Sequence, residues 1–149
     1  MRVTFLGQGF EPTSPNSVGI KLKDFLSSND YNSFFGISAF ASAAGVKGLS
    51  TYLETARPNF QDLTIVVGID QNGTSVEALE EILALGINSY IFYQKEPPIF
   101  HPKIYLFEGD NHNKIILGSS NLTANGLFSN HEGSLLVEFE STDAEGIQL

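Results

Sequence analysis

The chain has 149 residues, of which 42% are hydrophobic and 17% charged, a composition typical of one globular domain and not of a disordered segment. It has no cysteine, which excludes disulfides and thiolate metal sites and favours a cytoplasmic location, and no apolar run reaches the roughly 18 residues of a membrane span. The net charge of −9 argues against a large nonspecific nucleic-acid surface, because phosphate contacts need clustered lysine and arginine.

The first part of the chain alternates short apolar runs with stretches of helical spacing. Residues 3–6 and 34–41 predict strands, and residues 17–27 and 45–55 predict helices with apolar residues along one side. Gly36 lies inside the second predicted strand and indicates that another group approaches the backbone closely there.

The middle of the chain continues this alternation. Residues 63–67 form a continuous apolar run, which is typical of a fully buried strand. After a turn-rich loop, residues 74–77 (Thr-Ser-Val-Glu) have the spacing of a capping box, which predicts a helix from there to about Leu85. Gly86 ends that helix, and residues 87–93 predict the next strand.

The last part of the chain is rich in strand patterns. Residues 103–108 and 114–117 predict a hairpin, and residues 133–140 predict a final strand. Strands that alternate with helices predict an α/β fold with a mixed sheet. We expect one domain over residues 1–140, followed by a polar tail over residues 141–149 that could begin a linker to a further domain.

Two basic residues, His101 and Lys103, stand two positions apart at the start of the predicted hairpin. With the alternation of a strand they share one face with Tyr105, while Ile104 and Leu106 share the other. Because the second face is apolar, we expect it to lie in the core. A solvated strand end with incidental basic residues is the alternative, and the spacing alone does not decide between the two.

A small polar turn, Gly-Ser-Ser-Asn at residues 118–121, follows the hairpin and is expected to precede a helical turn at residues 123–127. Backbone N–H groups at such a turn can hold a phosphate, although an ordinary β-turn with a polar cap has the same composition. Glu132 opens the last strand and could accept a hydrogen bond from a histidine ring nitrogen. A nucleophile or base, a fixed cation and neutral donors together suit attack on a phosphodiester.

In order and spacing these residues resemble the phospholipase D superfamily, whose signature is His-x-Lys, then a hairpin, then Gly-Ser-x-Asn, with a glutamate further on. The matching positions are His101, Lys103, Gly118, Ser119, Asn121 and Glu132. Residues 38–45 are similar to the family's second strand and following helix, and residues 68–75 to a loop of its metal-independent restriction-endonuclease branch. The chain departs from the family at Glu108, where an aspartate is common, and in a longer hairpin turn.

The resemblance implies an α-β-α sandwich around a mixed central sheet, and a phosphodiesterase that needs no metal or other cofactor. The family mechanism needs two His-x-Lys motifs at one pocket, and this chain has one, so the resemblance implies a homodimer joined through the active-site face. The implied catalytic residues are His101, Lys103, Asn121 and Glu132. The implied substrate-binding residues are Lys103, Asn121 and one or both of Ser119 and Ser120.

Within this mechanism His101 forms a covalent phosphohistidine and Glu132 orients His101. We expect a DNA substrate and a place as the nuclease domain of a restriction, defence or helicase-linked protein, whose other parts supply nucleic-acid affinity.

The acidic balance motivates the alternative of a dimerising or nucleic-acid-docking module without chemistry. A phospholipid-acting enzyme ranks last, because no basic amphipathic face favours membrane contact. We expect His112, on the hairpin tip, and His131, facing away from Glu132, to lie outside the catalytic group.

Overall fold

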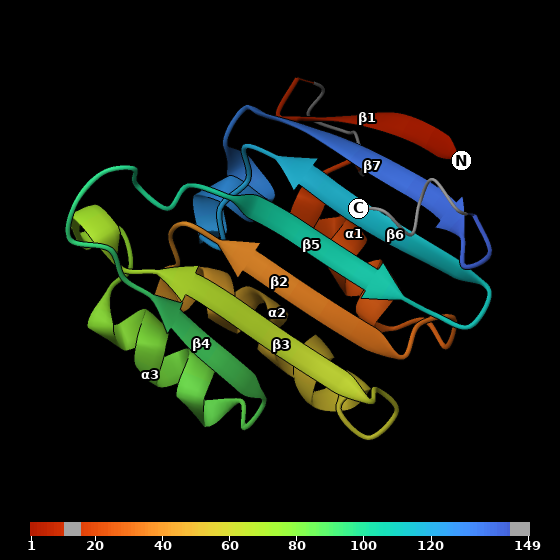
Figure 1. Ribbon diagram of the computed structural model, residues 1–149, viewed down its shortest axis with the longest axis horizontal. Coiled ribbons are helices and arrows are strands. Elements are labelled where there is room, and N and C mark those ends of the chain that lie inside the picture. Colours follow the sequence, from red (N-terminus) through yellow and green to blue (C-terminus); the bar gives the residue numbers. More distant parts are fainter. Residues whose placement is uncertain (11–15, 144–149) are drawn as a thin grey trace.

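A seven-stranded sheet forms the centre of the structure, a computed structural model that describes residues 1–10 and 16–143 (Figure 1). The strands are β1 (Arg2–Gln8), β2 (Ser33–Ser38), β3 (Asp62–Gly68), β4 (Asn88–Phe92), β5 (Lys103–Glu108), β6 (His112–Gly118) and β7 (Glu132–Glu140). Their order is β1-β7-β6-β5-β2-β3-β4. β2, β3 and β4 are parallel and the remaining neighbours are antiparallel, so the sheet is mixed, and every predicted strand is present.

The described part of the chain forms the three predicted helices and two short helical turns. These are α1 (Val18–Leu26), α2 (Ala43–Ala56), α3 (Val76–Ala84), η1 (Asp70–Asn72) and η2 (Asn125–Ser129). A serine side chain caps the start of each longer helix by accepting a hydrogen bond from a backbone N–H of the first turn. The caps are Ser17, Ser42 and Ser75.

The start of α3 differs from the predicted capping box. Ser75 is the cap, with the Ala78 N–H 3.2 Å from its hydroxyl oxygen. The Thr74 hydroxyl is used elsewhere: it donates to the Gly68 carbonyl at 2.6 Å and accepts from the Ala41 N–H at 2.9 Å. The predicted capping box placed the cap one residue too early and was wrong. Thr74 instead links the segments that follow β2 and β3.

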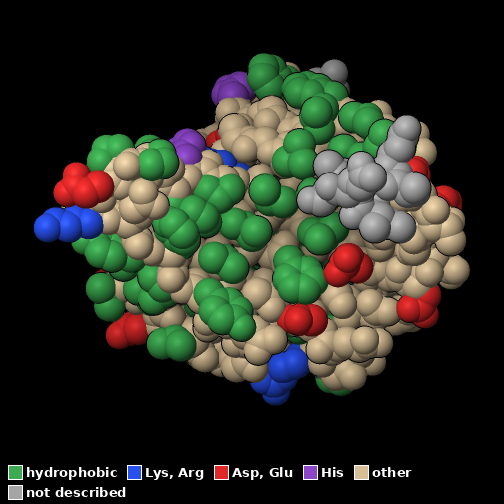
Figure 2. Space-filling model, viewed as in Figure 1, with side chains coloured by type: hydrophobic (Ala, Val, Ile, Leu, Met, Phe, Trp, Pro, Cys, Tyr) green, Lys and Arg blue, Asp and Glu red, His purple; other side chains and the backbone are tan. Residues whose placement is uncertain are grey.

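The helices of the described residues lie on one face of the sheet, behind the strands in Figure 1. The predicted α/β fold with a mixed sheet is confirmed, and residues 1–10 and 16–143 supply one helical layer. Hydrophobic side chains are visible at many places on the opposite face (Figure 2). Phe5 and Leu135, which are partners across β1 and β7 and alternate with the buried Leu6 and Leu136, are 63% and 40% exposed.

The orientation of β5 is the reverse of the predicted one. Tyr105 and Phe107 point toward the helices and are 1% and 0% exposed, and Lys103 shares their face at 6%. Ile104 and Leu106 lie half-buried on the open face. The prediction was wrong because both faces of the strand carry large apolar side chains, and the aromatic pair has more apolar surface to bury.

Phe107 lies at the centre of an aromatic cluster in the core. Its ring packs against Phe25, Tyr31 and Phe34, with centroid separations of 4.8–5.5 Å. The four rings come from α1, β2, β5 and the segment between α1 and β2. This cluster therefore ties a helix to the two central strands.

We predict that Phe107→Ala lowers the free energy of unfolding by about 3–5 kcal/mol, because the change removes a fully buried ring and leaves a cavity. Urea unfolding followed by circular dichroism measures this change. The matched control is Phe5→Ala, which removes a 63% exposed ring and should stay within about 0.5 kcal/mol of the wild type. Equal losses in the two variants would contradict the assignment of Phe107 to the core.

Candidate functional site

The residues that the sequence singled out gather at one end of the sheet. β2, β3 and β6 end there, while β5 and β7 start there, because β5 and β7 run antiparallel to their neighbours (Figure 1). Lys103 is the first residue of β5, Gly118 the last of β6 and Glu132 the first of β7. The fold therefore brings together the His-x-Lys segment, the Gly-Ser-Ser-Asn turn and the glutamate.

His101 and Lys103 are in direct contact. The Lys103 ammonium lies 2.8 Å from His101 Nδ1 and 3.0 Å from Nε2, and donates to the His101 backbone carbonyl at 2.9 Å. The imidazole is exposed, whereas Lys103 is 6% exposed. The pair therefore presents a ring at the surface with a cation held directly beneath it.

Burial lowers the pKa of Lys103 below its ordinary value, and the negative charge of Glu132 partly opposes this effect by raising it. Burial also raises the pKa of Tyr105, whose hydroxyl donates to the Ser120 carbonyl at 2.9 Å. Tyr105 therefore serves as a neutral hydrogen-bond donor that fastens the polar turn to β5.

Asn121 is held by its side-chain oxygen. The Phe40 backbone N–H donates to Asn121 Oδ1 at 3.2 Å. With the oxygen turned toward the end of β2, the NH₂ group of the carboxamide points away from that strand and is suited to donate to an anion.

The two serines of the turn have different positions. Ser119 is exposed, and its hydroxyl donates to Glu132 Oε2 and accepts from the Gly133 N–H at 3.2 Å. Ser120 is 1% exposed, and its hydroxyl has no hydrogen-bond partner among the described residues. Of the pair, Ser119 is therefore the one accessible to a ligand.

Glu132 does not contact His101 within one chain. Its carboxylate accepts hydrogen bonds from the Ser119 hydroxyl and, at 3.2 Å, from Asn130 Nδ2. The predicted hydrogen bond between Glu132 and His101 is therefore not formed among the described residues, because the carboxylate accepts from the neighbouring Ser119 and Asn130 instead. Its effect on the pKa of Lys103 nevertheless indicates that Glu132 acts on the same site through its charge.

The other two histidines lie outside this group, as expected. His112 is the first residue of β6, at the opposite end of the strand from the turn, where its ring lies 3.7 Å from the Glu140 carboxylate. His131 is exposed and packs edge-on against Phe10 at 5.4 Å.

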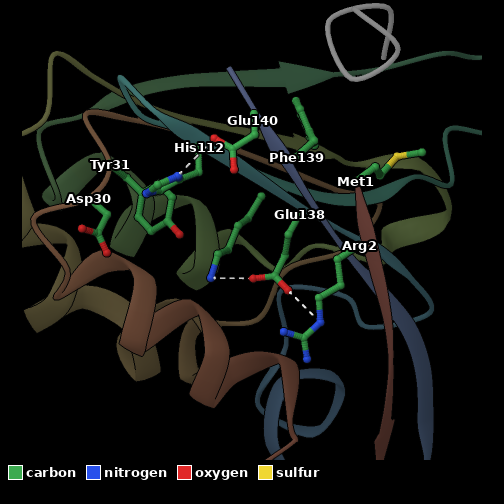
Figure 3. Close-up of a pocket in the computed structure, with 9 residues that line it drawn as sticks. Met1, Arg2, Asp30, Tyr31, His112, Glu138, Phe139 and Glu140 are labelled. Carbon is green, nitrogen blue, oxygen red and sulfur yellow. Dashed lines mark ion pairs between the residues drawn. The ribbon is translucent and has the colours of Figure 1, made fainter. Parts of the chain in front are cut away.

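A cavity of about 470 Å³ lies at that opposite end of the sheet and is lined by His112, Lys114, Glu138 and their neighbours (Figure 3). Glu138 lies between two cations, 3.0 Å from Lys114 and 3.7 Å from Arg2. Both cations are thus paired with Glu138, and Asp30 and Glu140 add two further carboxylates to the lining, so the cavity has no surplus of positive charge for a phosphate.

Three residues near the candidate site were not assigned a role from the sequence. Ser38, 1% exposed, donates to the Phe40 carbonyl at 2.7 Å and accepts from the Leu122 N–H at 2.8 Å, so it joins β2 to the polar turn. The Asp70 carboxylate accepts from the backbone N–H groups of Gln94 (3.0 Å) and Phe100 (3.2 Å). Asp70 therefore holds the segment that leads to His101.

Phe40 is the third of these residues. Nothing in the residue pattern marked it, because an aromatic residue after a strand is common in cores. Ser38 and Asp70 lie in the two segments that resemble the family, residues 38–45 and 68–75, but that resemblance does not identify their hydrogen-bond partners.

Within residues 1–10 and 16–143, no group of three or more His, Asp or Glu side chains is arranged to hold a metal ion. No helix in this part of the chain is both long enough and apolar enough to cross a membrane.

Comparison with known proteins identifies relatives of this fold. Residues 57–145, more than half of the chain, match the family described as "Cardiolipin synthase, PLD-like domain". No curated protein matches the chain in sequence.

Solved structures with the same fold include Nuc, a phospholipase D family member from Salmonella typhimurium, with a TM-score of 0.60 and 19% identity over 99% of this chain and 88% of Nuc. NucT from Helicobacter pylori has a TM-score of 0.62 and 15% identity over 99% and 89% of the two chains. Polyphosphate kinase from Porphyromonas gingivalis has a TM-score of 0.63 and 13% identity over 95% of this chain, which spans 24% of the kinase. At sequence identities of 13–19%, this similarity establishes the fold alone.

We predict that Lys103→Met stabilises the protein by roughly 0.5–2 kcal/mol at pH 7, because it removes a buried charge. Below the folded-state pKa of Lys103 the cost of this charge is present in full, and it disappears as pH rises toward the unfolded value near 10.5. The gain over the wild type should therefore shrink between pH 7 and pH 10.

Urea unfolding at both pH values measures the difference between variant and wild type. Lys95→Met, at an exposed position, is the control and should change stability little at either pH. A Lys103→Met variant that is less stable than the wild type at pH 7 would contradict a net cost of burying this ammonium.

Proposed function

Because the chain belongs to the phospholipase D-like family, we propose that it is a metal-independent phosphodiesterase that cleaves DNA through a covalent phosphohistidine. The contact that carries this proposal is the 2.8 Å separation between the Lys103 ammonium and the His101 ring. A histidine nucleophile needs a fixed positive charge at the place where the attacked phosphate gains negative charge, and this pair supplies both.

In the proposed reaction, a ring nitrogen of His101 attacks phosphorus, an N–P bond forms and the P–O bond to the leaving group breaks. The partner's His101 donates a proton to the leaving oxygen. It then takes a proton from a water molecule, which attacks phosphorus and breaks the N–P bond, so that both histidines return to their starting state. Lys103 and the NH₂ group of Asn121 stabilise the non-bridging oxygens. The exposed Ser119 hydroxyl joins them when it turns its single proton from Glu132 to the substrate.

The need for a second histidine supports a homodimer with one pocket at its two-fold axis. Each chain carries a single His-x-Lys motif, and His101 is exposed at the end of the sheet, where a second copy can approach it. A symmetric dimer would place two identical motifs face to face.

DNA as substrate is supported by the name of one structural neighbour. A yeast tyrosyl-DNA phosphodiesterase mutant matches 91% of this chain, which spans 31% of that protein, with a TM-score of 0.56 and 18% identity. Because the net charge is −9, we propose that most of the affinity for DNA comes from further domains or subunits of a restriction, defence or helicase-linked protein.

The family description, which names cardiolipin synthase, supports phospholipid as the second candidate substrate. The same histidine chemistry can act on any phosphodiester, so the two candidates differ in substrate binding and not in the reacting groups. Activity on phospholipid vesicles, compared with activity on DNA, distinguishes them.

We predict that the wild type cleaves DNA in excess EDTA and that His101→Ala lowers kcat at least ~1000-fold, because the nucleophile is lost. Cleavage of single- and double-stranded DNA, phospholipid vesicles and a nitrophenyl phosphodiester measures the activity. His131→Ala is the control, since the ring of this exposed histidine packs on Phe10. Quenching in alkaline denaturant with a phosphorus-labelled substrate should trap a base-stable, acid-labile phosphohistidine in the wild type alone.

Retained cleavage by His101→Ala would rule out the proposed nucleophile. A folded wild-type dimer that cleaves none of these substrates and forms no adduct would instead favour the non-catalytic docking module, the reading that the acidic composition suggests.

We predict that the active site is shared between two chains. When wild type and His101→Asn are unfolded and refolded together in equal amounts, about a quarter of the dimers are wild type on both sides. If each pocket needs both histidines, the activity falls to about a quarter of that of the same total amount of wild type. A value near half would mean that each chain works alone, and sedimentation velocity checks that the mixture is dimeric.

A further inference from the structure

Phe40 contacts several residues of the candidate site, and no role in the site has been assigned to it above. It lies between the end of β2 and the start of α2 and is half-buried. Its ring approaches His101 and Lys103, and its backbone N–H bonds Asn121. One residue therefore touches three of the four candidate catalytic residues.

The ring of Phe40 forms a wall beside the proposed nucleophile. The Phe40 and His101 ring centroids are 5.7 Å apart with an interplanar angle of 77°, an edge-to-face contact. The Lys103 ammonium lies 5.9 Å from the centre of the same ring, on its face. Because His101 is otherwise exposed, this contact restricts the orientations that the imidazole can adopt.

The backbone of Phe40 is fixed on both sides. Its N–H donates to Asn121 Oδ1 at 3.2 Å, and its carbonyl accepts from the Ser38 hydroxyl at 2.7 Å. Ser38 is 1% exposed and also accepts from the Leu122 N–H. A displacement of Phe40 would therefore move the Asn121 carboxamide together with the aromatic ring.

Gly73 leaves the space that the Phe40 ring occupies. A Cβ atom at Gly73 would lie 1.8 Å from Cδ1 and 2.2 Å from Cε1 of Phe40. The backbone of Gly73 has φ −76° and ψ −17°, which any L-residue adopts, so its conformation does not require glycine. Glycine is needed at residue 73 because any side chain there would overlap the Phe40 ring.

The two segments cannot separate freely to relieve such a clash. Next to Phe40, the Ala41 N–H donates to the hydroxyl of Thr74, which follows Gly73, at 2.9 Å. Thr74 in turn donates to the Gly68 carbonyl at 2.6 Å. A side chain at residue 73 would therefore move the ring of Phe40 rather than the backbone.

We propose that Phe40 is a positioning residue for this site, which sets the orientation of His101 with its ring and that of Asn121 with its backbone, and that Gly73 provides the space for that ring. The consequence for catalysis rests on the proposed phosphodiesterase function. The contact between the rings does not, so it can be tested separately.

The kinetic test compares Phe40→Leu, Phe40→Ala, Gly73→Ala and the double variant Phe40→Ala/Gly73→Ala. Phe40→Leu and Gly73→Ala should each lower kcat about 10- to 100-fold with KM changed less than about threefold, because the ring contact that orients His101 is altered while the backbone N–H that holds the substrate-binding Asn121 remains. In the Phe40→Ala background, Gly73→Ala should cost less than about twofold, because the ring that it displaces is absent. Equal effects of Gly73→Ala in both backgrounds would overturn the role assigned to Gly73.

The control is Phe35→Leu, another half-buried phenylalanine, which lies on β2 on the face away from the site and should keep kcat within about twofold. Thermal unfolding of every variant verifies that the assays are done on folded protein. Phe40→Leu with the kinetics of Phe35→Leu would overturn the positioning role.

The second test needs no activity. The chain has three histidines, so the imidazole Cε1–H signals of His101, His112 and His131 can be resolved by NMR and assigned with His101→Asn. The His101 signal should move in Phe40→Leu and in Gly73→Ala, while those of His112 and His131 stay in place. An unmoved His101 signal in both variants would overturn the ring contact. If the wild type is inactive on every phosphodiester and the His101 signal moves as expected, the proposed function fails and the positioning contact stands.

Discussion

The antiparallel register between β2 and β5 is the constraint on which the candidate site depends. It sets Ser38 opposite Lys103, and four pairs further along, on the same face, it sets Phe34 opposite Phe107. Because side chains alternate along a strand, a shift of one residue would turn Lys103 to the open face and bring Ile104 under the helices. The ring contact between Phe34 and Phe107, at 4.8 Å, opposes such a shift. Core packing therefore determines where the buried ammonium lies.

Side-chain hydroxyl groups join the loops beyond that register, beside the short parallel bridge between Ala41 and Leu122. Ser38 bonds the Leu122 N–H of the polar turn, and Thr74 bonds both the Ala41 N–H and the Gly68 carbonyl. Each bond contributes only about 0.5–1.5 kcal/mol to stability, but losing one would leave a buried donor or acceptor unpaired at a larger cost. The hydroxyls therefore help to fix the relative positions of three loop segments that follow the named strands.

The sequence predicted the elements well because their periods of two and of about 3.6 residues are clear, and it predicted which residues gather because strand ends meet at one edge of a sheet. It placed β5 with the wrong face inward, since Ile104 and Tyr105 are both large and apolar. It also predicted a hydrogen bond between Glu132 and His101, whereas the Glu132 carboxylate accepts a hydrogen bond from the Ser119 hydroxyl. Choices of hydrogen-bond partner depend on loop geometry within a few tenths of an ångström, which spacing along the chain does not specify.

The charge of the whole chain and the charge of the site act over different distances. Surface carboxylates account for the net charge of −9, and at physiological salt their effect decays over about 8 Å. Lys103 is 6% exposed, and in such a water-poor position its charge interacts more strongly with an anion than a surface lysine would. The burial that lowers its pKa is thus the same burial that strengthens its field, and the charge of Glu132 opposes the loss of the proton. An acidic protein can therefore carry a strong local site for a phosphate, while its overall charge governs how readily a polyanion approaches.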